Sequence, residues 1–406
     1  MTERLKARLE KAVLLAAAAA GLGLAFVMAL WVYVSATATP LHPAEQTVPS
    51  DPGAADPSWA EAIGQGRTLA RTAITTQNLP GLSVAVGVRD RIVWAEGFGW
   101  ADLTERIPVT PDTRFRIGTA STVLTSAAVG LLLEQGRLSL DDEVRVHVPE
   151  FAPPDGAVTL RQVMGHTAGL RSDGGDEGPL YSVHCERPVE ALAHFASRPL
   201  LFEPDTAYRF SSYGWIVMSA VVEAASGEAF LRFMRKQVFE PIGMDDTRAD
   251  SADETLPSRA TPYFPRFAAD PRFGPDPMRP VDYSCYAGSS VFLSTPSDLV
   301  RFALAMRDGR LLRPETVAAL QAPRRLRSGE PTGYGLGWDL EAVPLGGQPT
   351  TVVGHDGDIL GGRVASLLVF PDDGLVVAVT SNTSYADTAE IGRQVAERFV
   401  AAATSR

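Results

Sequence analysis

The chain has 406 residues, of which 45% are hydrophobic and 21% are charged, and its formal net charge is −11. This composition is ordinary for a globular protein with a full core, and the length suits one large or two medium domains. An acidic chain lacks the excess of Lys and Arg that binds nucleic-acid phosphates, so we expect no nucleic-acid partner.

The N-terminus carries the signals of a membrane segment. Four basic side chains lie within residues 1–11, and an uncharged apolar run over residues 12–34 follows, long enough to span a bilayer as a helix. The next basic residue is Arg67, so the positive-inside rule predicts a cytoplasmic N-terminus (1–11), a transmembrane anchor (12–34) and an extracytoplasmic remainder. The open alternative is a cleaved signal peptide, because Ala-Thr-Ala at residues 36–38 fits a cleavage site.

Beyond the apolar run, residues 35–57 hold five prolines and no periodic apolar pattern, which predicts a linker. The globular part is expected over residues 58–404. Its expected elements are a helix over 59–76, strands over 82–88 and 91–99, helices over 123–135, 160–164, 212–225, 228–238 and 296–307, strands over 364–370 and 375–381, and a helix over 387–402. Strands at both ends around a helical middle predict an α/β sheet domain with an inserted helical domain, and a ligand cleft between them.

Two further features leave alternatives open. Residues 248–282 form a long stretch rich in Pro and aromatic side chains, and loops of such length are usually functional or disordered. Cys185 and Cys285 are the two cysteines of the chain. They are compatible with a disulfide in an oxidising compartment or with two separate thiols, and we expect neither to be catalytic.

Several short motifs follow one another in the globular part. Residues 115–125 read Phe-Arg-Ile-Gly-Thr-Ala-Ser-Thr-Val-Leu-Thr, and residues 208–215 read Tyr-Arg-Phe-Ser-Ser-Tyr-Gly-Trp. Tyr-Gly-Leu-Gly-Trp at 334–338 and Gly-His-Asp-Gly at 354–357 come later. In this order and spacing the chain resembles the serine β-lactamase-related and penicillin-binding-protein-like family, over roughly residues 58–400. The resemblance implies a β-lactamase/transpeptidase-like α/β (α+β) fold, with an antiparallel sheet flanked by helices and an inserted helical domain.

The resemblance also implies where the catalytic groups should lie. In the family a Ser attacks a carbonyl, a Lys three residues later and a Tyr-x-Asn motif handle the proton, and a His-x-Gly or Lys-Thr-Gly motif lines the cleft. Here Thr119 takes the Ser position and Thr122 the Lys position. The Tyr-x-Asn positions fall on Phe210 and Ser212, and His355 and Gly357 keep the third motif.

Four other residues are candidates for the roles of the substituted catalytic groups. Lys236 is the one Lys outside the first eleven residues, and it lies in a charged helical stretch where a solvated side chain is expected. Tyr208, two residues before Phe210, is expected to lie about 6–7 Å away along an extended segment, which is too far for it to replace the Tyr directly. His355 is a further candidate base for Thr119. Ser121 should point away from Thr119 as a hydroxyl at the helix N-terminus.

Two other kinds of site are not expected. Residues 165–169 (Gly-His-Thr-Ala-Gly) imitate a nucleophile elbow, but they lack the strand before and the helix after that an elbow requires. The six histidines form no metal-binding pair, and no phosphate-binding loop is present, so neither a metal nor a cofactor is expected.

These substitutions predict an exported, membrane-anchored serine-hydrolase homologue with lost or reduced acyl transfer. Losing one member of such a catalytic unit costs on the order of 10⁴–10⁶ in rate. The cleft would then bind a ligand such as a cell-wall peptide, an ester, a β-lactam-like molecule or a partner protein. Two alternatives stay open: an active hydrolase of esters, β-lactams or D-amino-acid peptides that uses Thr119, and a structural domain whose cleft is closed by Phe210.

Overall fold

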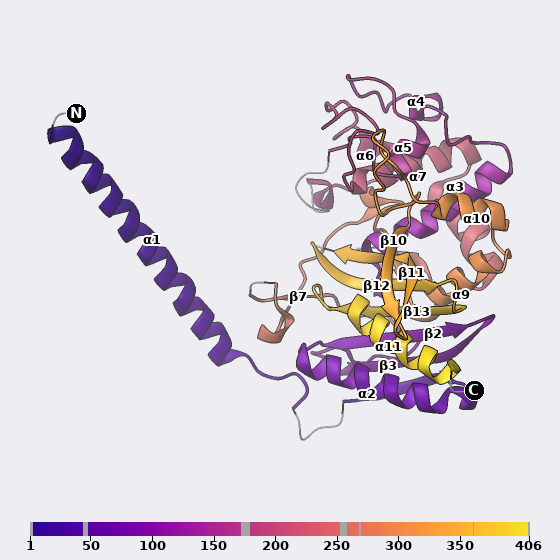
Figure 1. Ribbon diagram of the computed structural model, residues 1–406, viewed down its shortest axis with the longest axis horizontal. Coiled ribbons are helices and arrows are strands. Elements are labelled where there is room, and N and C mark those ends of the chain that lie inside the picture. Colours follow the sequence, from indigo (N-terminus) through magenta and orange to yellow (C-terminus); the bar gives the residue numbers. More distant parts are fainter. Residues whose placement is uncertain are drawn as a thin grey trace.

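The computed structural model describes residues 3–43, 48–171, 179–251, 258–267, 269–359 and 361–404. The N-terminal helix α1 (Glu3–Thr37) projects from the folded domain (Figure 1). Its stretch Arg8–Thr37 is long and apolar enough to cross a membrane, and side chains such as Leu22 and Phe26 are exposed. A membrane anchor and a signal sequence both contain a helix of this kind.

An eight-stranded antiparallel sheet forms one half of the domain, in the order β1-β3-β2-β13-β12-β11-β10, with β4 paired to β3. Its strands are β1 (Ser50–Ala55), β2 (Gly81–Val88), β3 (Arg91–Asp102), β4 (Ile107–Pro108), β10 (Asp339–Leu345), β11 (Gln348–Ile359), β12 (Gly362–Phe370) and β13 (Leu375–Ser381). The two ends of the chain meet at the β2–β13 pair, where Leu82 lies opposite Ser381. The antiparallel sheet implied by the family resemblance is confirmed.

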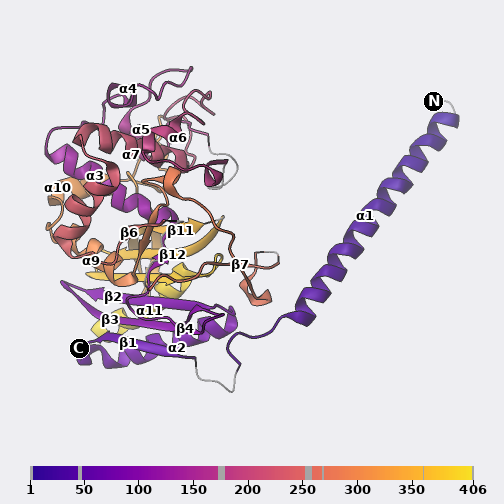
Figure 2. The same cartoon turned by 180° about the vertical axis from the view of Figure 1, so that it is seen from behind.

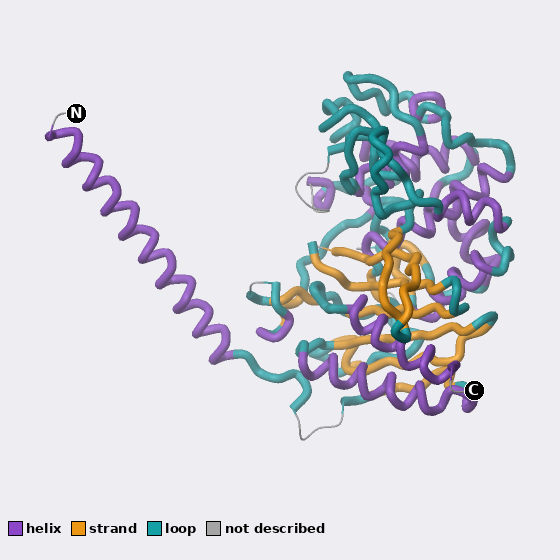
Figure 3. The backbone as a smooth tube through the Cα atoms, in the orientation of Figure 1, coloured by secondary structure: helices purple, strands orange, loops and turns teal. Residues whose placement is uncertain are grey.

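Helices cover both faces of this sheet. On one face α2 (Ala60–Thr76) and α11 (Thr388–Thr404) pack side by side, and on the other α9 (Pro296–Arg307) crosses β2, β3 and β13. Side chains alternate along each strand, so Val84 and Val86 join the core under α2 and α11, whereas Ala85 joins the second core. Figure 3 shows the strands gathered between the two outer helices and the helical half of the domain.

The helical half is built around α3 (Ser121–Glu134) and α7 (Ser212–Ser226), which pack on each other. The other elements of this half are the 3-10 turns η2 (Gly118–Ala120) and η3 (Pro179–Ser182), and the helices α4 (Val144–His147), α5 (Leu160–Met164), α6 (Pro188–Leu192), α8 (Phe230–Phe233), the π-type η4 (Met234–Phe239) and α10 (Pro314–Gln321). The helix expected over residues 228–238 is therefore two shorter pieces of different winding.

Cys185 and Cys285 form a disulfide, with their Cα atoms 4.9 Å apart. The bond joins the segment before α6 to the 3-10 turn η7 (Ser284–Tyr286), across a sequence separation of 100 residues. This answers the alternative that the sequence left open.

Part of the segment expected as a linker, residues 35–57, belongs to other elements. Helix α1 continues to Thr37, and residues 50–55 form the edge strand β1. Strands β10 and β11, which the apolar pattern did not predict, complete the opposite edge of the sheet. Within residues 248–282 lie the short strands β6 (Arg248–Ala249), β7 (Tyr263–Pro265) and β8 (Pro275–Pro277) and the turn η6 (Pro271–Phe273). With β5 (Phe115–Arg116) and β9 (Phe292–Ser294), β6 forms a small second sheet.

Candidate active site

Thr119 lies in η2, immediately before α3, and this turn packs directly against strand β11. The contact is so close that each backbone needs a glycine. A Cβ atom on Gly357 would lie 1.9 Å from the Ile117 carbonyl oxygen, and one on Gly118, whose φ is +52°, would lie 2.3 Å from the Asp358 carbonyl oxygen. The fold therefore brings the first and third sequence motifs together.

The hydroxyl of Thr119 is held by the backbone of β11. Its Oγ1 donates a hydrogen bond to the Asp356 carbonyl oxygen (3.1 Å) and accepts one from the Asp358 N–H (2.9 Å). The residue is only 2% exposed. A carbonyl oxygen accepts a hydrogen bond but is no base at neutral pH, so this arrangement does not activate the hydroxyl as a nucleophile.

His355, on β11, uses both ring nitrogens within the protein. Its Nδ1 lies 2.5 Å from the Asp356 carbonyl oxygen, which can only accept, so Nδ1 carries the proton. In the neutral ring, Nε2 then accepts from the Tyr334 hydroxyl at 3.0 Å. The Asp339 carboxylate lies farther off, 3.9 Å from Nδ1. The lone pair that a general base would need is therefore directed at Tyr334 and not at Thr119.

Tyr334 fills the space beside the position where the family has its Lys. It is fully buried, and its hydroxyl is close to the side chain of Thr122. Burial raises the pKa of the Tyr334 hydroxyl well above its usual value of 10, and the nearby Asp339 carboxylate adds to the effect. The phenol is therefore neutral at physiological pH. The buried Thr122 hydroxyl interacts with this phenol, but no hydrogen bond of good geometry joins the two groups.

A cluster of rings surrounds this group, with His166 at its centre. The His166 ring centroid lies 4.4 Å from that of Phe210 and 4.8 Å from that of Tyr334. Phe210 in turn lies 6.0 Å from His355. Phe210, half-buried, thus presents a purely apolar ring to both histidines.

His166 is held neutral by its surroundings. Burial lowers the pKa of His166 to about 3, and the neighbouring His355 acts in the same direction. The backbone N–H of Ser211 and the indole N–H of Trp215 both point at its ring nitrogens, at 3.2 and 3.3 Å. A neutral imidazole accepts at one nitrogen only, so one of these contacts is a hydrogen bond and the other is a close polar approach. Protonation would remove the acceptor altogether.

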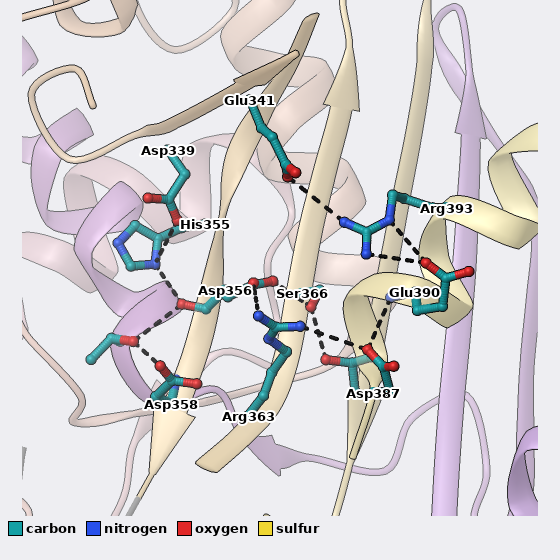
Figure 4. Close-up of polar contacts among 12 residues, drawn as sticks. Asp339, Glu341, His355, Asp356, Asp358, Arg363, Ser366, Asp387, Glu390 and Arg393 are labelled. Atoms are coloured by element: carbon teal, nitrogen blue, oxygen red, sulfur yellow. Dashed lines mark hydrogen bonds and ion pairs between the residues drawn. The ribbon is translucent and has the colours of Figure 1, made fainter. Parts of the chain in front are cut away.

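Behind β11, the carboxylate of Asp356 anchors the strand to its neighbours. Ser366 Oγ donates to it at 2.6 Å and Arg363 forms an ion pair at 2.7 Å, while Ser366 also contacts Thr388 of α11 at 2.8 Å (Figure 4). Burial raises the pKa of Asp356, although Arg363 and Ser366 oppose the shift. This network fixes the backbone carbonyl that holds Thr119.

A cavity of about 290 Å³ lies at the edge of the sheet, next to His355. Its polar lining includes Asp339 and Glu341 of β10 and Arg393 of α11 (Figure 4). Arg393 pairs with Glu341 at 3.7 Å across its mouth. The cavity is large enough for a small polar group beside the third motif.

The remaining candidates from the sequence are placed as follows. Tyr208 lies at the rim of the ring cluster, 6.0 Å from the His166 ring centroid and 36% exposed. Ser212, the first residue of α7, and Ser121, the first residue of α3, are both buried. The hydroxyl of Thr119 bonds instead to the backbone of β11.

The elbow-like residues 165–169 follow helix α5, and His166 has a positive φ of 56°. The Thr167 hydroxyl donates to the Asp205 carboxylate at 2.7 Å, a structural contact of a turn. Among the described residues no group of three or more His, Cys, Asp or Glu side chains is arranged for a metal ion.

Sequence reasoning missed two residues of this site. In the sequence, Tyr334 stands out only as part of the motif at 334–338, and His166 only as part of residues 165–169, which resemble a nucleophile elbow. Their roles come from packing between segments that are far apart in the chain, which the local sequence does not report.

Comparison with known proteins gives this geometry a family. The β-lactamase family model matches residues 62–401. A penicillin-binding protein of Bacillus subtilis is 27% identical over 276 residues, which cover 66% of this chain and 60% of that protein. The human mitochondrial serine β-lactamase-like protein LACTB is 27% identical over 319 residues, covering 62% of this chain and 57% of that protein.

Solved structures agree on the fold. A penicillin-binding protein homologue from Pyrococcus abyssi superposes with a TM-score of 0.70 at 22% identity, covering 84% of this chain and 77% of that one. The D-amino acid amidase of Ochrobactrum anthropi gives 0.66 at 21% identity, covering 84% and 99%. The chain spans about 60% of the length of the first curated relatives it matches. The family model covers most of the chain, and this chain therefore belongs to the β-lactamase family.

Proposed function

We propose that this protein is a membrane-anchored, extracytoplasmic member of the β-lactamase family whose acyl transfer is lost or strongly reduced, and that it binds a ligand in the family cleft. The ligand would be a cell-wall peptide, an ester or a β-lactam-like molecule. The family assignment supports the choice of ligand classes, and the N-terminal apolar helix supports the anchor.

One observation carries the catalytic part of the proposal. The Thr119 hydroxyl donates its proton to the Asp356 carbonyl oxygen, while the His355 lone pair is taken by Tyr334. No lysine lies within residues 12–235, so the group that would hold the proton in the family is missing from that stretch. A hydroxyl without an adjacent base is a weak nucleophile.

The test is covalent labelling of the purified full chain. It is incubated with a fluorescent penicillin, a chromogenic cephalosporin and a short-chain nitrophenyl ester, and its intact mass is recorded. We expect no adduct and no turnover. An adduct on Thr119, or turnover that Thr119→Val abolishes, would establish the alternative of an active hydrolase.

The complementary experiment restores the side chains that the family has at its catalytic positions. The triple variant Thr119→Ser, Thr122→Lys, Phe210→Tyr supplies a nucleophile, an ammonium group and a phenol at the three family positions. We expect it to form a penicillin adduct at least about 10²-fold faster than the unmodified chain, because an activated nucleophile gains that much from a positioned base. The matched control replaces Thr119 with Ala and keeps the other two changes, and it should form none.

Ligand binding in the absence of acyl transfer is measured on the unmodified chain. A ligand that binds only the folded state raises the midpoint of thermal unfolding, by an amount that grows with ligand concentration. We expect such a shift with a penicillin or with a peptide ending in two D-alanines. If no ligand of these classes shifts the midpoint, the cleft is closed and the domain is structural.

A further inference from the structure

The antiparallel pair of β7 and β8 forms a small hairpin that stands apart from the main sheet. It comprises residues 263–267 and 269–277 and is called the β7–β8 hairpin below. Both views of the ribbon show it projecting from the domain toward the end of α1 (Figures 1 and 2). Its base is fixed to the main sheet, because Tyr263 N–H donates to the Asn382 carbonyl at 2.7 Å and its hydroxyl accepts from the Leu103 N–H at 2.9 Å.

The hairpin contacts α1 where the apolar stretch ends. Arg266 donates to the Val34 carbonyl oxygen (2.8 Å) and to Thr37 Oγ1 (3.0 Å). The last carbonyls of a helix lack partners within the helix, and a cation there is favoured by the helix dipole. Val34 is 6% exposed, whereas Leu22 in the middle of α1 is 74% exposed. The hairpin therefore meets α1 at the level where a bilayer would give way to water.

The segment that follows α1 is short and is held to the domain by hydrogen bonds. Asn78 donates to the Thr39 carbonyl oxygen (3.3 Å) and accepts from the Leu41 N–H (2.7 Å). The buried His42 binds the Leu79 carbonyl at 2.9 Å. Thr39 lies two positions beyond Thr37, a reach of about 7 Å when extended. The domain consequently stays beside the end of α1.

The hairpin has the chemistry of a membrane interface. Phe264, Phe267 and Phe273 are half-buried, and the rings of Phe267 and Phe273 pack edge to face at 5.7 Å. The side chain of Arg272 is 70% exposed and forms an ion pair with Asp270 at 2.6 Å. Aromatic rings prefer the level of the lipid headgroups, and Arg side chains reach phosphates from there.

Local charge agrees with this placement. Residues 263–277 contain two Arg and two Asp, a net charge of 0. Residues 1–40 have four basic and two acidic side chains, a net charge of +2, so residues 41–406 carry −13 of the chain's net −11. The hairpin is thus a neutral, aromatic segment on an acidic domain.

The length of α1 favours contact between the hairpin and lipid. The uncharged run over residues 12–34 has 23 residues, which as a helix measure about 35 Å. The hydrocarbon core of a bilayer is about 30 Å thick, so a helix of this length spans it with a small tilt. The last residues of the run, which include Val34, then lie at the bilayer surface beside the hairpin.

We propose that the β7–β8 hairpin is a membrane-docking element that inserts its aromatic and Arg side chains among the lipid headgroups of the extracytoplasmic leaflet. This inference rests on the proposed anchorage by α1. Together, α1 and the hairpin give the domain two contacts with the bilayer, which fix its orientation and hold the cleft at a set distance from the surface.

The test uses the full chain in nanodiscs made from phosphatidylcholine with brominated acyl chains, which quench nearby indoles. Phe267→Trp adds an indole to the hairpin. Glu397→Trp is the matched control, because Glu397 is exposed on α11, whose C-terminal end lies across the domain from α1 (Figure 1). Fluorescence of the unmodified chain is subtracted, and thermal unfolding checks that each variant is folded.

We expect brominated lipid to remove at least half of the fluorescence added by Phe267→Trp and none of that added by Glu397→Trp. Equal quenching of the two variants overturns the proposal. A loss of Phe267→Trp quenching as the number of chains per nanodisc rises also overturns it, because a second copy of the chain then covers the hairpin. The mass of the protein extracted from cell membranes tests anchorage separately. A mass that lacks α1 would show that α1 is cleaved in cells. This result refutes the anchor, independently of the quenching measured with the intact chain.

Discussion

At Gly357 the backbone of β11 lies against the turn before α3 with no room for a side chain. Gly357→Ala would place its methyl 1.9 Å from the Ile117 carbonyl oxygen, which is a main-chain atom and cannot swing away. We expect the free energy of unfolding to fall by about 2 kcal/mol or more, as overpacking of a tight contact does. Urea unfolding monitored by circular dichroism measures the change.

The matched control for this substitution is Gly64→Ala. Gly64 lies within α2, and a Cβ atom there would meet nothing within 4 Å. Alanine is the better helix former, so we expect a gain of about 0.5–1 kcal/mol. Equal losses in the two variants would show that the contact between β11 and η2 is looser than described.

The buried His166 predicts a particular dependence of stability on pH. Its pKa is about 3 in the folded chain, because of burial, and 6.5 in the unfolded chain. Between these values the unfolded state binds the proton and the folded state does not. The free energy of unfolding should therefore fall as pH drops below 6.5, by up to about 1.4 kcal/mol per pH unit from this group, and show no contribution above 6.5.

Urea midpoints between pH 7.5 and 4.5 test this expectation. The variant His166→Gln should lose part of the slope below pH 6.5, whatever its stability at neutral pH. His194→Gln serves as the control, since His194 is exposed and its removal should leave the slope unchanged. A slope that is the same in all three proteins would mean that His166 is protonated in the folded state.

At the level of single residues, the assignment of Thr119 and His355 to the family's catalytic positions stays a prediction. The fold does bring Thr119 against β11, the strand that carries His355. What could not be predicted is that the Asp356 carbonyl takes both the Thr119 proton and the His355 Nδ1–H. Main-chain acceptors belong to every residue, so no residue type signals them.

Among the larger elements, the disulfide between Cys185 and Cys285 ties the segment before α6 to the turn η7 across 100 residues. In the unfolded chain such a bond removes much of the entropy of a long loop. We expect the double variant Cys185→Ser, Cys285→Ser to lose about 2–5 kcal/mol of stability. Thermal or urea unfolding measures it.

A reducing agent supplies the control for the disulfide. It should lower the stability of the unmodified chain to about that of the double variant and should leave the double variant unchanged. If the reagent destabilises both proteins equally, or neither, then the bond contributes nothing beyond the packing around it.

The strands that could be predicted are those whose side chains report their environment. In β2, β3, β12 and β13, apolar or β-branched runs flank short turns, and all four appear where expected. Strand β1 has the sequence Ser-Asp-Pro-Gly-Ala-Ala and pairs with β3 through its main chain. Strand β10 is largely exposed. Both are edge strands, for which an apolar pattern is no guide.

For the molecule as a whole, the division into a sheet half and a helical half could be predicted because the two ends of the chain are rich in strands and the middle in helices. The family resemblance added the antiparallel order, which the fold confirms. The docked position of the chain after α1 could not be predicted. It depends on Asn78 and Leu79, which lie in a turn after α2 and carry no signal of a distant partner.

The pairing of β2 with β13 has a consequence for how the protein is made. Gly81 and Ser381 are joined by a side-chain hydrogen bond although 300 residues separate them. Translation at about 5–20 residues per second delivers the second strand about 15–60 s after the first. Throughout that interval the early strands have an open edge, which is a template for aggregation. A holding chaperone or, for the exported chain proposed above, the bilayer beside α1 would have to shield that edge until the last strands arrive.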